Sequence, residues 1–260
     1  MITSDLKQRI IGAFYFVPII IGTIMGQPFM GVVIGCLQAL MCYELAKILS
    51  EKNGYGRKAI IGLTGLFLLA ALSTRIQLSG LSPFALAGLL SLVSFVVVMV
   101  KWRFFEALFT LALLQCLSSL SLLITLPYAE LILVALALIV TAVDVVAYFV
   151  GRAVGGRKLA PSISPGKTIS GGIGGLVGAV IMAFIMAPYL GFIHSNMIIT
   201  GIIIGVLVQA GDLYESAFKR HMNIKDSSNI IPGHGGFLDR FDGYIFIIPL
   251  SLALLAAAAS

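Results

Sequence analysis

Apolar runs long enough to cross a lipid bilayer recur along the whole of this chain. Each is close to the roughly 20 residues that an α-helix needs to span the hydrocarbon core. Charged residues make up only 11% of the 260 positions, whereas soluble domains carry about 25%. Because so few charges could not cover the surface of a soluble domain, we predict an all-α, multi-pass membrane protein.

About nine transmembrane helices are predicted, with the N-terminus in the cytoplasm. With that orientation, 16 of the 17 Lys and Arg residues lie on the cytoplasmic side and only Arg75 lies opposite, as the positive-inside rule requires. The predicted spans cover residues 10–26, 29–49, 58–73, 80–100, 104–127, 129–150, 171–192, 196–220 and 241–258. We expect a single integral membrane domain over residues 1–260, located in the inner (plasma) membrane.

The basic balance of the chain is a consequence of this topology. The formal net charge of +6 needs no nucleic-acid partner, because the positive-inside bias produces most of it. The first span lacks a convincing cleavage site and another span follows at once, so we interpret it as a mature helix rather than a signal peptide.

One segment, residues 212–242, breaks the apolar pattern. It holds five of the 11 carboxylates, four of the 17 Lys and Arg residues, and two of the three histidines. Ionisable groups at membrane depth are costly and usually mark a functional site. We therefore predict that this segment binds a charged ligand or takes part in chemistry.

Two predicted spans carry polar stripes at the level of the cytoplasmic leaflet. Asp144, Tyr148 and Arg152 are spaced four residues apart and share one helix face. The second stripe, also at helical spacing, consists of Asp212, Ser216, Lys219 and Arg220. We predict that the two stripes converge on one site, and structural ion pairs within the membrane are the alternative.

Glu44 is a weaker candidate for the same site. It lies in the second predicted span, and Lys47 follows it by three residues. An ordinary ion pair at a helix end explains these two residues at least as well as a functional role.

The loop before the last span adds carboxylates and cations in close succession. Lys225 precedes a Pro-Gly-His-Gly-Gly turn that contains His234, and Asp239, Arg240 and Asp242 follow. A helix cap by Asp239 and a turn role for His234 explain only part of this pattern. Carboxylates beside cations suit a complex of phosphates with Mg²⁺, which prefers oxygen ligands. Zinc is not expected, because the histidines lack zinc-type spacing.

A second loop, residues 155–168, briefly resembles a nucleotide-binding P-loop. The Walker spacing requires glycine where Pro161 stands, and no strand is predicted before the loop. We therefore predict a basic, glycine-rich loop that binds phosphates through Lys167, Arg157 and backbone amides. Small-residue spacing typical of close helix packing follows at Gly171, Gly174, Gly175 and Gly178.

Twelve residues at fixed spacing over 27 positions resemble the signature of the bacterial-type phosphatidate cytidylyltransferase (CDP-diacylglycerol synthase) family. They read Ser216-x-x-Lys219-Arg220, Lys225-Asp226 and Pro232-x-His234-Gly235-Gly236-x-x-Asp239-Arg240-x-Asp242. The resemblance extends to Asp144-x-x-Ala147-Tyr148-x-x-Gly151-Arg152, to Ile163-Ser164-Pro165-x-Lys167-Thr168 and to the opening Lys7–Ile11. It is strongest over residues 140–245, so we expect catalytic motifs there and mainly scaffold helices in 1–139. Ser170 and Gly243 depart from the family pattern, which leaves the roles of these two positions open.

The resemblance implies transfer of the cytidylyl group of CTP to phosphatidate, giving CDP-diacylglycerol and pyrophosphate. It also implies a homodimer in the lipid bilayer and a requirement for Mg²⁺, as one ion or two. Catalytic roles are expected for Asp212, Asp239, Lys219 and Ser216, and metal binding for Asp212, Asp239, Asp144 and Asp242. Substrate binding is expected from Arg220, Lys225, Arg240, His234, Lys167, Ser164, Arg152 and Tyr148.

A multi-pass, proton-coupled transporter of organic anions is the alternative function. Intramembrane Asp residues and a basic mouth would suit a transporter. A transport path also needs polar residues through the outer leaflet, and the outer halves of the last four predicted spans are almost wholly apolar. We therefore favour the enzyme.

Overall fold

The computed structural model describes residues 17–52, 54, 57–72, 83–101, 103–189 and 197–259. The predicted signature at Lys7–Ile11 and the single opposite-side cation Arg75 lie outside these described residues. The chain divides into two compact units. Unit 1 comprises Met1–Leu126 and Phe218–Phe241, and unit 2 comprises Pro127–Ala217 and Asp242–Ser260.

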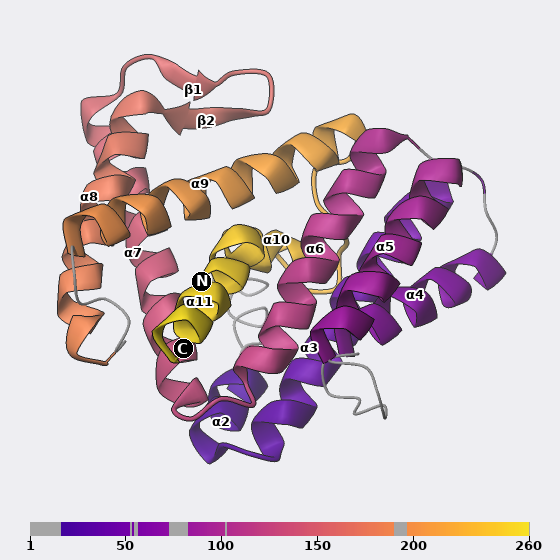
Figure 1. Cartoon of the computed structure of the whole chain (residues 1–260). Helices are drawn as coiled ribbons and strands as arrows, with labels where there is room; N and C mark the ends of the chain where they lie inside the picture. The colour runs from indigo at the N-terminus through magenta and orange to yellow at the C-terminus, as the bar shows by residue number, and fades with distance from the viewer. Residues whose placement is uncertain are drawn as a thin grey trace, which may run out of the picture. The chain divides into compact units, whose positions relative to one another are not determined.

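Helices account for most of the described chain (Figure 1). They are α2 (Val17–Met25), α3 (Phe29–Lys52), α4 (Arg57–Leu72), α5 (Pro83–Lys101), α6 (Phe104–Leu123), α7 (Ala129–Val154), α8 (Ile169–Met186), α9 (Met197–His221), α10 (Leu238–Phe241) and α11 (Tyr244–Ala259). Five of them, α3, α6, α7, α8 and α9, are long and apolar enough to cross a membrane. The structure thus confirms an all-α membrane protein. Every predicted span overlaps a described helix, but nine crossings and a cytoplasmic N-terminus stay predictions.

Unit 1 is built on α3, which packs against α2, α4 and α6. A buried polar link joins α3 to α6, because the Gln38 amide donates to the Leu117 carbonyl at 2.8 Å and to Ser121 Oγ at 2.9 Å. The last turn of α9 also belongs to this unit, where Phe218 stacks on Phe109 with ring centroids 3.9 Å apart. His221 Nε2 lies 3.1 Å from the buried Glu106 carboxylate. Contacts to α6 therefore hold the end of α9 that carries Lys219 and Arg220.

Unit 2 is built on the pair α7 and α8, which run side by side (Figure 1). Glycines allow this close approach, as predicted from their spacing. A Cβ atom placed on Gly174 would lie 2.7 Å from Val150 Cβ, and one on Gly171 would lie 2.7 Å from the Ala147 carbonyl oxygen. α9 packs on α8 in the same way at Gly201.

The basic, glycine-rich loop predicted at residues 155–168 contains a β-hairpin, which was not predicted from the sequence. Strands β1 (Lys158–Ala160) and β2 (Ser164–Thr168) pair antiparallel with an irregular register between them. The strands are short and carry Pro161 and Pro165 in and beside them, so the alternation that signals a strand is lost from the sequence. Thr168 caps α8, since its side-chain oxygen accepts from the Gly171 amide at 3.1 Å.

Candidate functional site

Charged side chains gather in two clusters, one in each unit. The loop cluster of unit 1 comprises Glu44, Lys219, Ser227, Ser228 and Asp239. The cavity cluster of unit 2 comprises Asp144, Tyr148, Arg152, Lys167 and Asp212. The two clusters contain seven of the 14 predicted site residues, two in the loop cluster and five in the cavity cluster.

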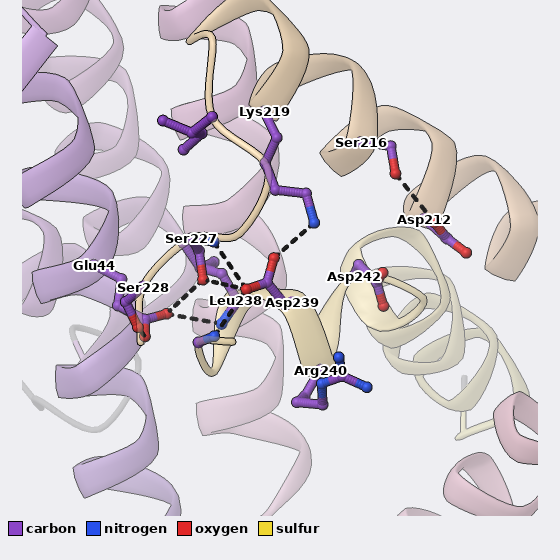
Figure 2. A network of polar contacts seen from close by, with 12 residues as sticks. Glu44, Asp212, Ser216, Lys219, Ser227, Ser228, Leu238, Asp239, Arg240 and Asp242 are labelled. Carbon is purple, nitrogen blue, oxygen red and sulfur yellow. Dashed lines mark hydrogen bonds and ion pairs between the residues drawn. The ribbon is translucent and has the colours of Figure 1, made fainter. Parts of the chain in front are cut away.

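Asp239 is the centre of the loop cluster (Figure 2). Its Oδ1 accepts a hydrogen bond from Lys219 Nζ at 2.6 Å. Its Oδ2 accepts three more, from the Ser227 amide at 2.8 Å, the Ser227 hydroxyl at 2.9 Å and the Gly236 amide at 2.8 Å. Burial by itself would raise the pKa of Asp239, but the hydrogen bond and charge of Lys219 and the two backbone amides together lower the pKa below its ordinary value. The carboxyl is therefore ionised at neutral pH.

A glycine-rich turn brings the Gly236 amide to Asp239. Gly233 and Gly235 have positive φ angles of 74° and 83°, a region that side chains with a Cβ atom rarely adopt. At Gly236 an added Cβ atom would lie 2.0 Å from Ser227 Oγ and 2.5 Å from Glu44 Oε1. Gly233 and Gly235 are therefore needed for their backbone conformation, and Gly236 is needed because no side chain would fit there.

His234 and Arg240 stabilise the same turn. The Arg240 guanidinium donates to the His234 carbonyl from Nε at 3.1 Å and from Nη2 at 2.9 Å. His234 Nδ1 lies 3.3 Å from the Pro232 carbonyl oxygen, which favours the turn role for this ring in the arrangement described. The rest of the Arg240 side chain is exposed.

Glu44 does not form the helix-end ion pair with Lys47 that was one of its two possible roles. It is 1% exposed, and both carboxylate oxygens accept hydrogen bonds from the loop of residues 227–238. Lys47 instead pairs with Glu51, at 3.8 Å on the outer face of α3. The sequence did contain a signal for Glu44, because a lone acid among apolar residues of a predicted span usually faces the protein interior. Ser227 and Ser228, whose hydroxyls lie 3.3 and 2.5 Å from the Glu44 carboxylate, carried no such signal.

Two further cations predicted to bind substrate, Arg220 and Lys225, are at the surface. Arg220 is exposed at the end of α9 and donates to the Ile224 carbonyl at 2.9 Å. Lys225 is exposed on the loop that follows. Both are thus accessible to a ligand that arrives from solution.

The cavity cluster lines a hollow of about 660 Å³ that lies wholly within unit 2. Its walls come from α7, the hairpin, the start of α8, and α9. Arg152 Nη1 donates to the Tyr148 hydroxyl at 2.8 Å, and Asp144 lies one turn before Tyr148, as the predicted stripe requires. Ser164 is in β2 opposite Ala160 and is not among the residues that line the hollow.

Asp212 forms an ion pair with Lys167, which joins α9 to the hairpin. Both side chains stay partly exposed to the cavity. Ser216 Oγ lies 3.4 Å from Asp212 Oδ1, a long contact one helical turn away. Asp242 Oδ1 accepts from the Gly243 amide at 2.8 Å at the start of α11.

Magnesium commonly binds to one or two carboxylates and takes its other ligands from substrate phosphates and water. Within the described ranges, no group of three or more His, Cys, Asp or Glu side chains is placed to hold a metal ion. Asp212 lies beside Lys167 in a cavity that Asp144 also lines, and Asp239 lies beside Lys219. This donor set fits a hard cation that arrives with a nucleotide, and not a closed site made by protein ligands alone.

Comparison with known proteins agrees with this chemistry. A profile of the Cytidylyltransferase family matches residues 7–258. The phosphatidate cytidylyltransferase of Bacillus subtilis (strain 168) is 46% identical over 120 residues, which cover 45% of each chain. That of Staphylococcus aureus (strain COL) is 48% identical over 120 residues, covering 45% of this chain and 46% of the relative. The matched stretch therefore spans slightly under half the length of these relatives.

The family profile extends well beyond that stretch and runs from before α2 into α11. It includes the helices of unit 1 as well as the signature region. The resemblance inferred from the signature is thus confirmed, and the chain belongs to the cytidylyltransferase family.

Proposed function

We propose that this protein transfers the cytidylyl group of CTP to phosphatidate, giving CDP-diacylglycerol and pyrophosphate. A phosphate oxygen of phosphatidate would attack the α-phosphorus of CTP, and the bond between the α-phosphorus and the bridging oxygen to the β-phosphate would break. The family match over residues 7–258 carries this proposal. The name shared by the Bacillus and Staphylococcus relatives supports the choice of phosphatidate as acceptor.

The barriers to this reaction are electrostatic. The attacking phosphate is already an anion, so no strong general base is needed. Two anions must approach each other, and negative charge builds up on the pyrophosphate that leaves. Fixed cations lower both barriers by positioning the reactants and stabilising the developing charge. The pairs Lys167–Asp212 and Lys219–Asp239 supply cations and metal-binding oxygens of this kind.

Within this proposal, Asp212 and Asp239 would hold Mg²⁺, one ion or two, and Asp144 and Asp242 would add ligands or orient neighbouring cations. A bound Mg²⁺ would neutralise phosphate charge. Ser216 would donate a hydrogen bond to a phosphate oxygen. Phosphate contacts are assigned to Lys219, Arg220, Lys225, Arg240, Lys167, Arg152, Tyr148, Ser164 and, as a donor, His234.

The site would face the cytoplasm. The 16-to-one distribution of Lys and Arg supports this orientation, together with nine crossings and a place in the inner membrane. CTP would then arrive from the cytoplasm while the acyl chains of phosphatidate stay in the lipid. A homodimer is expected from the family resemblance alone, and light scattering of the purified protein checks it.

Purified protein in detergent tests the proposal directly. With CTP, phosphatidate and Mg²⁺ we expect CDP-diacylglycerol, and we expect EDTA to abolish its formation until Mg²⁺ is restored. The same assay with ATP, GTP and UTP checks the preference for cytidine. If the folded protein yields no product but moves organic anions across liposome membranes, the enzyme is refuted in favour of the transporter.

A further inference from the structure

Glu44 is a buried carboxylate to which the proposed function assigns no role. It lies in the second half of α3, an apolar helix, and is 1% exposed. Burial of a carboxylate is costly unless hydrogen bonds or a cation compensate for the lost water. In the described part of the chain, every group that donates to Glu44 is neutral. Among the described residues, hydrogen bonds from neutral groups are what compensate for the burial of Glu44.

The donors come from the two ends of one loop (Figure 2). At its beginning, the Ser228 hydroxyl donates to Glu44 Oε1 at 2.5 Å and the Ser227 hydroxyl lies 3.3 Å from Oε2. At its end, the Phe237 amide donates to Oε1 at 3.1 Å and the Leu238 amide to Oε2 at 2.9 Å. A single side chain thus closes the loop of residues 227–238 against α3.

Glu44 and Asp239 share a hydrogen-bond partner. The Ser227 hydroxyl lies 2.9 Å from Asp239 Oδ2 as well as 3.3 Å from Glu44 Oε2. One hydroxyl has only one hydrogen to donate, so the shorter contact favours Asp239 and the backbone donors matter more for Glu44. Leu238, whose amide binds Glu44, directly precedes Asp239 in α10. If Glu44 moved, Asp239 would therefore be displaced in two ways, through the adjacent residue Leu238 and through their shared partner Ser227.

We propose that Glu44 is a positioning residue for cytidylyl transfer: it holds the loop of residues 227–238 in the form that presents Asp239 and its partner Lys219. This inference rests on the proposed function. Glu44 itself touches no substrate in the proposal. Its role is to fix the loop, because a misplacement of about 1 Å in a reacting group can cost roughly a hundredfold in rate.

Glu44→Gln tests the proposal with little change in volume. The amide group of Gln would face at least one backbone N–H donor, so one hydrogen bond is replaced by a donor–donor contact. We expect amide hydrogen exchange at Phe237 and Leu238 to speed up by roughly tenfold or more. We expect kcat and kcat/KM to fall together, by on the order of a hundredfold.

Two further variants separate positioning from folding. Glu44→Asp keeps the charge, so we expect part of the rate and of the exchange protection to return. Glu51→Gln is the matched control, an exposed acid two turns further along α3 whose side chain is 61% exposed, and we expect no change in rate or loop exchange. If Glu44→Gln does not fold, Ser228→Ala removes one donor and is expected to give the same effects at a smaller size.

Coupling provides a third test. Glu44 and Ser228 act through one loop in this proposal, so the double variant should lose little more activity than Glu44→Gln alone. Wild-type exchange and wild-type kcat in folded Glu44→Gln would overturn the inference, as would an equal loss in Glu51→Gln. A wild-type protein that makes no CDP-diacylglycerol would instead refute the proposed function, and the exchange measurement, which needs no substrate, tells the two failures apart.

Discussion

The two clusters use the same kind of ion pair in different surroundings. In the loop cluster, the side chains of Lys219 and Asp239 are 12% and 4% exposed, and three further donors occupy the other Asp239 oxygen. In the cavity cluster, Lys167 and Asp212 are 29% and 23% exposed and line a hollow of about 660 Å³. A buried carboxylate with several hydrogen-bond donors is held in place before any ligand binds, whereas a partly exposed one can exchange its lysine for a ligand more easily. The loop cluster is therefore the more fixed of the two and the cavity cluster the more adaptable.

The largest expected effect comes from neutralising either carboxylate. We expect Asp212→Asn and Asp239→Asn each to lower kcat by on the order of a thousandfold, since each would lose a metal ligand and a charge-stabilising group. The comparison predicts a difference in hydrogen exchange. The loop of residues 227–238 should exchange faster in Asp239→Asn and remain as in wild type in Asp212→Asn.

Steady-state kinetics of each purified variant measure kcat, and mass spectrometry measures hydrogen exchange in the loop of residues 227–238. A variant that retains wild-type turnover would remove its carboxylate from the proposed metal site. Equal loop exchange in both variants would show that Asp239 does not organise the loop.

Removal of the two lysine side chains should destabilise the protein by different amounts. Lys219→Ala leaves a buried carboxylate without its cation, and we expect a loss of about 3 kcal/mol in the free energy of unfolding, the low end for a broken buried pair because three other donors stay. Lys167→Ala breaks a partly solvated pair and should cost about 1 kcal/mol or less. Its main effect should be a higher KM for CTP. Thermal unfolding in detergent and steady-state kinetics check both, and similar stability losses would erase the distinction between the clusters.

A smaller effect is expected at the glycine turn. Gly236→Ala would place a Cβ atom 2.0 Å from Ser227 Oγ, so the loop must shift, and we expect roughly a tenfold loss of kcat. Gly65→Ala is the matched control, because it lies in α4 with no atom within 4 Å of the added Cβ. The control should keep full activity and gain slightly in stability, since alanine is the better helix former. Full activity in Gly236→Ala would mean that the tight turn is not required for catalysis.

Much of the fold could be predicted from hydropathy, because apolar runs and their length are local properties of the chain. All nine predicted spans overlap described helices, and the small-residue spacing from Gly171 to Gly178 correctly indicated close helix packing. The hairpin of β1 and β2 was missed because two prolines hide its short strands. The sequence left open whether Glu44 pairs with Lys47 or belongs to the site. In the structure Lys47 pairs with Glu51, since a helix allows contacts at both i+3 and i+4.

The sequence by itself determined the membrane class, the family and the residues of the signature, because these depend on composition and on fixed spacing along the chain. Only the tertiary structure decided what each carboxylate contacts. Glu44 binds Ser227 across a separation of 183 positions, and no periodicity or spacing connects residues so far apart. The charge-dense segment of residues 212–242 is thus divided between a loop held by Glu44 of α3 and a helix that lines a cavity. Burial and the need to satisfy every buried polar group produced that division.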